Sequence, residues 1–295
     1  MNFLGKRLVV FGAGYVGAEV ARQGIVRGLR VTALTRNADK ARALAAAGVE
    51  TIVADLADDD WHARIAGGAD FVLNSVSSGG GGLDGYQRSY VQGMQSVLAW
   101  AERSGGPSGT LIYTGSTSVY PQDGGPVVTE AMAVGGNEKA DLLVATEALA
   151  ARWPGRRWVL RLAGIYGPGR HHLLDQLRAG AADLGGRGDH RLNLIHRDDI
   201  CTAIWAGFGT SPGAAGEIFN LADDYAATKV EVVTWLAAQL GVPVPSFTGE
   251  GVPGRRAVMP DRVIASEKIR RTLGWHPVFP TFREGYAAIL LLNLA

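Results

Sequence analysis

A glycine motif near the start of the chain constrains the fold more than any other feature. The short apolar run Leu8–Phe11 leads into Gly12, Gly14 and Gly17, which have the spacing G-x-G-x-x-G, and a helix-like run begins at Ala18. When this motif joins a strand to a helix, the first glycine makes a tight turn, the second lets the backbone approach a pyrophosphate, and the third lets the helix pack closely on the strand. The first turn of the helix offers its N–H groups to the phosphates. The pattern predicts a dinucleotide-binding unit, and its alternative is a glycine-rich turn without a ligand.

The end of the second predicted strand, Arg30–Leu34, distinguishes between the two nicotinamide dinucleotides. NAD-binding chains carry Asp or Glu there to accept from the ribose 2′-hydroxyl. Here Thr35 and Arg36 follow the strand, and the first acid is Asp39. An arginine can meet a 2′-phosphate with a planar, bidentate fork, whereas a carboxylate would repel it. The sequence therefore favours NADP(H) over NAD(H), and the alternative is that Arg36 is a solvated charge that opens the next helix.

The third predicted strand, Glu50–Val53, is followed by a second pair of candidate residues. Asp55 and Leu56 come just after the strand. A small acid at this place could meet the edge of an adenine, or it could cap the turn before Asp58–Asp60. The sequence leaves both roles of Asp55 open.

A run of serines and glycines, Ser77–Gly82, follows the fourth predicted strand. Doubly wound folds bind their ligands at the carboxyl ends of the strands. We therefore expect a mobile loop near the cofactor.

Composition and charge exclude several classes of protein. The chain has 295 residues, 47% of them hydrophobic, and a net charge of +1, so it can bury a sizeable core but has no electrostatic case for binding nucleic acid or an anionic membrane. Cys201 is the only cysteine, which excludes a disulfide framework or a cysteine metal cluster and suits a reducing cytoplasm. Met1–Gly5 is too short for a signal peptide, and no apolar run reaches the ~18 residues of a membrane span. We expect a cytoplasmic protein without nucleic-acid or membrane partners.

Strand-like and helix-like segments alternate from the N-terminus to Leu221. Helical spacing of apolar residues marks Gly85–Arg103 and Glu138–Arg152. The strand-like runs are apolar throughout, as in a parallel sheet that is buried on both faces. They are Leu8–Phe11, Arg30–Leu34, Glu50–Val53, Phe71–Ser75, Thr110–Thr114, Trp158–Leu162 and Glu217–Leu221. The alternation predicts an α/β protein with a doubly wound parallel sheet, the Rossmann fold.

Beyond Leu221 the pattern changes, which predicts a smaller C-terminal domain that binds the substrate. Thr228 and Glu231 form a T-x-x-E capping box, so a helix begins there and ends near Gly241. Residues rich in Pro and Gly follow, and then two short helices. The predicted boundaries are 1–165 and 190–222 for the dinucleotide-binding domain, and 166–189 and 223–295 for the substrate-binding domain.

Four later segments carry patterns of one family, in the right order. Thr110–Tyr120 is a strand that ends in a turn rich in Ser and Thr and then Val-Tyr, and Arg161–Arg170 contains an arginine and Tyr-Gly-Pro. Ile195–Ile200 contains His-x-Asp-Asp, and Glu217–Ala222 is a late strand. Together with the N-terminal glycines, these segments resemble the extended short-chain dehydrogenase/reductase family, which includes NAD-dependent epimerases and dehydratases. The resemblance covers nearly the whole chain and implies a nicotinamide cofactor and a small-molecule substrate.

The resemblance also implies two catalytic residues. Ser116 occupies the position of the serine that holds a substrate carbonyl or alcohol against the nicotinamide, although it could instead satisfy backbone groups at the strand end. Lys139 occupies the lysine position of the family's Tyr-x-x-x-Lys element, but the tyrosine position is Gly135, which cannot transfer a proton. Tyr90 stands where the family has an asparagine. The chain therefore resembles an atypical branch of the family that lacks the catalytic tyrosine.

No other residue replaces the missing tyrosine by its spacing. A literal Tyr-x-x-x-Lys at Tyr225–Lys229 is rejected, because Tyr225 precedes a helix that starts at Thr228. The remaining tyrosines and histidines near the expected site favour packing or substrate contact over proton transfer. They are Tyr113, Tyr120, Tyr166, His171 and His172.

A metal site at His196, Asp198 and Asp199 is also rejected. One histidine with two acids that open a helix more simply caps that helix and forms hydrogen bonds. We therefore expect no metal.

These observations favour an NADP(H)-dependent oxidoreductase that acts on a carbonyl, an alcohol or a sugar-like small molecule. The first alternative is an NADP(H)-binding sensor or scaffold without turnover. The second is a nucleotide-sugar epimerase or dehydratase, which ranks last because its chemistry depends on the absent tyrosine. The residues assigned to the cofactor are Gly12, Gly14, Tyr15, Val16, Gly17, Arg36, Asp55, Leu56 and Lys139.

The substrate and the oligomeric state are less constrained. Helices around Tyr86–Arg103 and Glu138–Arg152 could pair in a homodimer. Five arginines could contact an anionic group of the substrate, although most of them are expected to be solvated surface residues. They are Arg170, Arg187, Arg191, Arg255 and Arg256.

Overall fold

A parallel sheet organises the computed structural model, which describes residues 2–65, 68–103, 109–210, 216–249 and 259–292. The sheet has seven strands in the order β11-β7-β5-β4-β1-β2-β3. All pairs between β3 and β5 are parallel, and Leu8 of β1 lies opposite Val31 of β2 and Phe71 of β4. The strand order reverses beside β1, which is the place where doubly wound sheets bind ligands. The expected Rossmann fold is confirmed.

The strands lie close to their expected positions. They are β1 (Arg7–Phe11), β2 (Arg30–Thr35), β3 (Glu50–Val53), β4 (Phe71–Asn74), β5 (Thr110–Ser116), β7 (Arg157–Leu162) and β11 (Glu217–Leu221). Alternation of strand and helix, with apolar runs of strand length, was sufficient to locate them.

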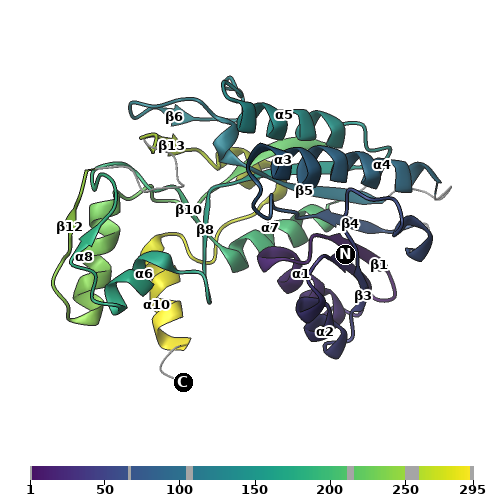
Figure 1. The fold of residues 1–295 in the computed structure, drawn as a ribbon, viewed down its shortest axis with the longest axis horizontal. Helices are drawn as coiled ribbons and strands as arrows, with labels where there is room; N and C mark the ends of the chain where they lie inside the picture. The colour runs from purple at the N-terminus through teal and green to yellow at the C-terminus, as the bar shows by residue number, and fades with distance from the viewer. Residues whose placement is uncertain (1, 66–67, 104–108, 211–215, 250–258, 293–295) are drawn as a thin grey trace. The chain divides into compact units, whose positions relative to one another are not determined.

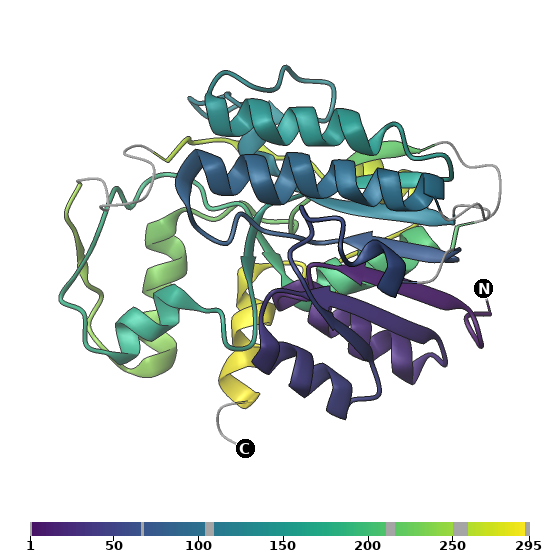
Figure 2. The same ribbon diagram turned by 45° about the vertical axis from the view of Figure 1, so that its right-hand side comes forward.

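Helices cover both faces of the sheet. Figures 1 and 2 show α4 (Gly93–Arg103) and α5 (Glu138–Ala150) over one face, and α1 (Tyr15–Val26) and α2 (Ala38–Ala46) over the other. Because neither face is open to water, the strands need apolar side chains on both sides. This explains why they read as continuous apolar runs and do not alternate.

The helix expected over Gly85–Arg103 consists of three consecutive segments. These are α3 (Gly82–Tyr86), a π-helical segment η2 (Gln87–Gln92) and α4. A π-helical turn accommodates an extra residue and is often found at functional sites. Apolar spacing does not reveal such an insertion, so the sequence predicted one regular helix.

An aromatic cluster fixes the segment that follows β3. The rings of Trp61 and Trp100 lie 4.9 Å and 5.4 Å from that of Phe11, measured between centroids. The indole of Trp61 donates to the carbonyl of Leu56 at 3.2 Å, and that of Trp100 donates to Ile65 at 3.0 Å. The core thereby holds the loop that carries Asp55 and Leu56 at the end of the sheet.

The chain divides into two compact units, each with its own core. The first comprises Met1–Tyr120, Ala133–Arg161 and Ala203–Phe219, and the second comprises Pro121–Met132, Leu162–Thr202 and Asn220–Ala295. Two short 3-10 helices, η1 (His62–Arg64) and η3 (Thr117–Val119), belong to the first unit, and α7 (Arg197–Phe208) has residues in both. The predicted domain boundaries and the substrate-binding role of the second unit stay predictions.

The second unit contains three two-stranded sheets and several helices. Its helix α8 begins with the expected capping box, in which Thr228 N–H donates to the Glu231 carboxylate at 2.7 Å and Glu231 N–H donates to the Thr228 hydroxyl at 3.3 Å. The elements are β6 (Val127–Val128), β8 (Gly164–Tyr166), β9 (Asp183–Leu184), β10 (Leu194–His196), β12 (Ser246–Phe247), β13 (Val263–Ile264), α6 (His172–Arg178), α8 (Lys229–Leu240), α9 (Glu267–Leu273) and α10 (Phe282–Leu292). Within the described ranges, no helix combines the length and the apolar character needed to cross a bilayer.

Candidate cofactor-binding site

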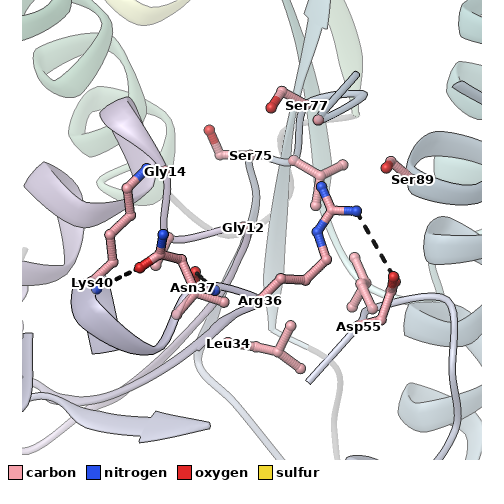
Figure 3. A pocket seen from close by; sticks show the side chains of 15 residues that line it. Gly12, Gly14, Leu34, Arg36, Asn37, Lys40, Asp55, Ser75, Ser77 and Ser89 are labelled. Carbon is pink, nitrogen blue, oxygen red and sulfur yellow. Dashed lines mark hydrogen bonds and ion pairs between the residues drawn. The ribbon is translucent and has the colours of Figure 1, made fainter. Parts of the chain in front are cut away.

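A cavity of about 480 Å³ lies in the first unit at the carboxyl ends of the strands around β1. It brings together five of the residues that the sequence assigned to a cofactor, namely Gly12, Gly14, Arg36, Asp55 and Leu56. Figure 3 labels the first four of them. The other four assigned residues, Tyr15, Val16, Gly17 and Lys139, do not line it. Lys40, Ser75 and Ser89 line it as well, and the motifs did not point to them.

The three glycines of the motif differ in how strongly the structure requires a residue without a side chain. Gly12 has a φ of +81°, and a Cβ there would lie 2.7 Å from the backbone of Val76. A Cβ on Gly17 would collide with the carbonyl oxygen of Gly12. At Gly14 the nearest atom to such a Cβ is 4.0 Å away. The packing of the chain therefore requires Gly12 and Gly17 but leaves room at Gly14, where a glycine suits the close approach of a phosphate.

The start of α1 is suited to an anion. Its N-cap residue is Gly14, no side chain caps the helix, and its first turn carries no acidic residue. The positive end of the helix dipole is therefore not neutralised by a carboxylate of that turn. This observation and the room at Gly14 fit a dinucleotide pyrophosphate at this place.

Arg36 follows β2 and reaches across the cavity (Figure 3). Its side chain is half exposed, and its Nη1 lies 3.8 Å from Oδ2 of Asp55. A Cβ on Gly79 would collide with Nη2 of Arg36, so the glycine-rich loop packs directly on the guanidinium. The next residue, Asn37, caps α2 by accepting from Lys40 N–H at 2.9 Å.

Asp55 takes part in the turn that the sequence allowed for it, and it also lines the cavity. Its Oδ1 accepts from Ala57 N–H at 3.0 Å, and its Oδ2 accepts from Nε of Arg88 at 3.1 Å. Burial raises the pKa of Asp55, but the Ala57 N–H and the charges of Arg88 and Arg36 outweigh burial and lower it. The carboxylate is therefore ionised at neutral pH. A contact with adenine stays a prediction.

Ser116 ends β5 and caps η3. Its hydroxyl accepts from Ser118 N–H at 3.1 Å and lies 2.8 Å from the Ser118 hydroxyl. The backbone role that the sequence left open is therefore present. When the Ser118 hydroxyl is the donor, the Ser116 proton can be donated to a substrate oxygen, so the catalytic role stays a prediction.

The surroundings of Lys139 differ from the expected arrangement. Helix α5 begins at Glu138 and is capped by Asn137, so Lys139 lies in the first turn and Gly135 precedes the helix. The predicted start of the helix at Glu138 is confirmed, and Asn137 is a preferred N-cap residue. Gly135 therefore does not share a helical face with Lys139, as the family's Tyr-x-x-x-Lys element would require.

The backbone at Gly135 disfavours a larger residue. Its φ is +97°, and a Cβ would lie 2.7 Å from Oδ1 of Asp141. Its N–H donates to the carbonyl of Val119 at 2.7 Å. The backbone is thus held in a left-handed conformation that side chains rarely adopt.

Tyr86 lies near Lys139. The Nζ of Lys139 lies 5.7 Å from the centre of the Tyr86 ring, and the rings of Tyr86 and Tyr90 are 5.2 Å apart. Burial and the neighbouring Tyr86 raise the pKa of Tyr90 to about 12. No motif singled out Tyr86, because it counted as an apolar position of a helix.

The tyrosines considered as replacement acids are packed inside the units. Burial raises the pKa of Tyr113 in the first unit and that of Tyr166 in the second. The Tyr120 hydroxyl accepts from Nη1 of Arg161 at 2.7 Å. His171 of the second unit pairs with Asp175, at 2.7 Å between Nδ1 and Oδ1. The surroundings of each of these residues agree with the prediction that it packs against its neighbours and does not transfer a proton.

His196 and its two acids have structural roles in the second unit. The Nδ1 of His196 accepts from Asp198 N–H at 3.2 Å, and burial lowers the pKa of His196 to about 4. Asp199 accepts from the N–H groups of Val278 and Phe279 at 2.5 Å and 3.2 Å. In the part of the chain that the structure describes, no three His, Cys, Asp or Glu side chains are grouped as metal ligands would be.

Two of the candidate substrate arginines form ion pairs with nearby acids. Arg187 pairs with Asp189 at 2.8 Å, and Arg191 pairs with Asp261 at 2.7 Å. Arg255 and Arg256 lie outside the described residues.

Comparisons with known proteins agree with this fold. Protein YeeZ of Escherichia coli is 25% identical over 284 residues, covering 93% of this chain and 97% of that protein. The 2-alkyl-3-oxoalkanoate reductase of Stenotrophomonas maltophilia is 30% identical over 257 residues, covering 81% and 76%. The solved structure of DesIV, a dTDP-glucose 4,6-dehydratase from Streptomyces venezuelae with NAD bound, superposes with a TM-score of 0.83 at 23% identity, covering 98% and 97%. The family model described as the NAD dependent epimerase/dehydratase family matches residues 8–222, and the chain belongs to that NAD(P)-binding family.

Proposed function

We propose that the chain is an NADP(H)-dependent oxidoreductase that acts on a carbonyl, an alcohol or a sugar-like small molecule. The observation that carries the proposal is Arg36, which lines the cavity at the end of β2 where an NAD-binding chain would place an acid. Lys40 lines the same cavity and adds a second cation. The reductase among the relatives supports the oxidoreductase class.

The residues of the first unit have distinct roles in this proposal. Gly12, Gly14 and the start of α1 hold the pyrophosphate, and Arg36 holds the 2′-phosphate. A nicotinamide cofactor bound there supplies hydride transfer. Ser116 donates a hydrogen bond to the substrate oxygen. Because position 135 carries no side chain, the proton comes from water or from another group.

A titration of the protein with NADPH and NADH tests the proposal, with Arg36→Ala as the variant. We expect tight NADPH binding, weaker NADH binding, and a loss in the variant that is specific to NADPH. Carbonyl compounds are then screened for oxidation of NADPH, with Ser116→Ala as the control. If neither nucleotide binds, the oxidoreductase proposal is wrong.

A second function is favoured by the backbone at Gly135. A chain whose backbone disfavours a tyrosine at this position could bind NADP(H) as a sensor or scaffold without turnover. This alternative predicts a cofactor-dependent change in shape or in partner binding while no substrate is consumed. A nucleotide-sugar epimerase remains the last alternative. A homodimer and a cytoplasmic location stay predictions.

A further inference from the structure

Asp55 lies between two arginines at the edge of the cavity, and we propose that this arrangement sets the preference for NADP(H) over NAD(H). Arg88 acts as a positioning residue that holds the Asp55 carboxylate and thereby leaves Arg36 available for a 2′-phosphate. The inference rests on the cofactor preference proposed above. It adds to it a residue that contacts neither the glycine motif nor the end of β2.

One carboxylate oxygen faces both guanidinium groups. Oδ2 of Asp55 lies 3.1 Å from Nε of Arg88 but 3.8 Å from Nη1 of Arg36. The first distance is that of a charge-assisted hydrogen bond, and the second is too long for one. Asp55 is therefore hydrogen-bonded to Arg88 and only near Arg36. The dashed line between Arg36 and Asp55 in Figure 3 marks the second, longer contact.

Arg88 is anchored at a second point. Its Nη2 lies 2.8 Å from Oδ1 of Asp58, and its backbone belongs to the π-helical segment η2. Ala57 N–H binds the remaining oxygen of Asp55. The two hydrogen bonds and the charges of these acids raise the pKa of Arg88. The pair of Asp55 and Arg88 is thus held at both ends.

Arg36 is held less firmly. The two arginine side chains are about equally exposed, but the contact of Arg36 with Asp55 is long, and its tip packs on the glycine-rich loop at Gly79. A guanidinium in this situation can exchange the contact with Asp55 for two parallel bonds to a phosphate. The exchange leaves Asp55 compensated, because Arg88 still binds it.

Loss of the Arg88 charge would change both the availability of Arg36 and the repulsion between Asp55 and a 2′-phosphate. Asp55 would then turn to Arg36, which would no longer be available to the phosphate. The carboxylate, no longer paired with Arg88, would also repel the doubly charged 2′-phosphate, as the acid of an NAD-binding chain does. NADH carries no 2′-phosphate, so its binding would change little.

The experiment is a fluorescence titration of the whole protein with NADPH and NADH, comparing Arg88→Met with the wild type. We expect the Kd for NADPH to rise about tenfold and that for NADH to change less than about twofold. Arg103→Met is the matched control, because Arg103 is also an exposed arginine beside an acid, 3.6 Å from Asp59. The control is expected to bind both nucleotides as the wild type does.

A second variant tests whether Arg88 acts through Asp55. In the double variant Arg88→Met with Asp55→Asn, no carboxylate competes for Arg36, so the affinity for NADPH should return toward the wild-type value. If Arg88→Met fails to fold, Asp58→Asn loosens Arg88 from the other side and should weaken NADPH binding in the same direction.

The outcomes separate this inference from the proposed function. A wild type without any preference for NADPH overturns the proposed cofactor and this inference with it. A wild type that prefers NADPH, combined with an unchanged NADPH to NADH ratio in Arg88→Met, overturns this inference alone. A double variant as weak as the single variant also overturns it, because Arg88 would then act directly.

Discussion

Arg161 and Glu147 form a two-bond ion pair inside the first unit. Nε and Nη2 of the guanidinium lie 2.9 Å and 2.7 Å from the two carboxylate oxygens, and both side chains are buried. Nη1 of Arg161 reaches the Tyr120 hydroxyl at 2.7 Å. The pair ties α5, which carries Lys139, to strand β7 of the seven-stranded sheet. It therefore fixes the helix on which one of the candidate catalytic residues lies.

Removal of one partner of this pair should destabilise the protein strongly. Glu147→Ala leaves the guanidinium buried without its counter-charge, so we expect a loss of about 3–5 kcal/mol in the free energy of unfolding. Urea denaturation followed by circular dichroism measures it. The double variant Glu147→Ala with Arg161→Met, which removes both charges, should recover part of the loss. A single variant as stable as the wild type would show that the buried pair is not formed.

The fold and part of the site could be predicted from the sequence because their causes are local. The strand, the turn at Gly12 and the close packing of Gly17 depend on neighbouring residues, so the motif located them. Arg88 could not be predicted, because it meets Asp55 across 33 positions of the chain and comes from a π-helical segment that apolar spacing does not reveal. The start of α5 at Glu138 could also be predicted, because helical spacing marks it and Asn137 is a preferred N-cap residue.

Gly14→Ala should separate cofactor binding from folding. A Cβ at position 14 comes no closer than 4.0 Å to another atom, whereas one at position 12 lies 2.7 Å from the backbone of Val76, and Gly12 also has a φ of +81°. We expect Gly14→Ala to melt within a few degrees of the wild type but to bind NADPH about tenfold more weakly. Gly12→Ala is the comparison and should lose both stability and binding. Differential scanning fluorimetry and a nucleotide titration measure the two effects. Normal NADPH binding by Gly14→Ala would place the pyrophosphate elsewhere.

Gly135→Tyr should not restore the family's tyrosine chemistry. The new side chain would need a left-handed backbone, and its Cβ would meet the Asp141 carboxylate. We expect a loss of about 1–3 kcal/mol in stability and no gain in turnover with carbonyl or nucleotide-sugar substrates. Gly124→Tyr is the matched control, because Gly124 also has a positive φ, +85°, but a Cβ there meets nothing within 4 Å. A gain of turnover in Gly135→Tyr would contradict this prediction and revive the epimerase alternative.

Asp223 should make the stability of the protein fall as the pH rises. Its side chain is buried in the second unit, one of its oxygens accepts from Tyr225 N–H at 3.3 Å, and the other has no partner among the described residues. Burial, with the nearby charges of Asp224, Asp199 and Glu284, raises its pKa from 3.8 to about 8.

Between these two pKa values the folded state keeps a proton that the unfolded state has lost. The free energy of unfolding therefore decreases with rising pH over this window. Asp223→Asn removes the titration, so the variant should gain stability relative to the wild type between about pH 5 and about pH 8, by a few kcal/mol. Urea denaturation at the two pH values measures the difference. If the stability of the variant differs from that of the wild type by the same amount at both pH values, Asp223 keeps an ordinary pKa in the folded protein.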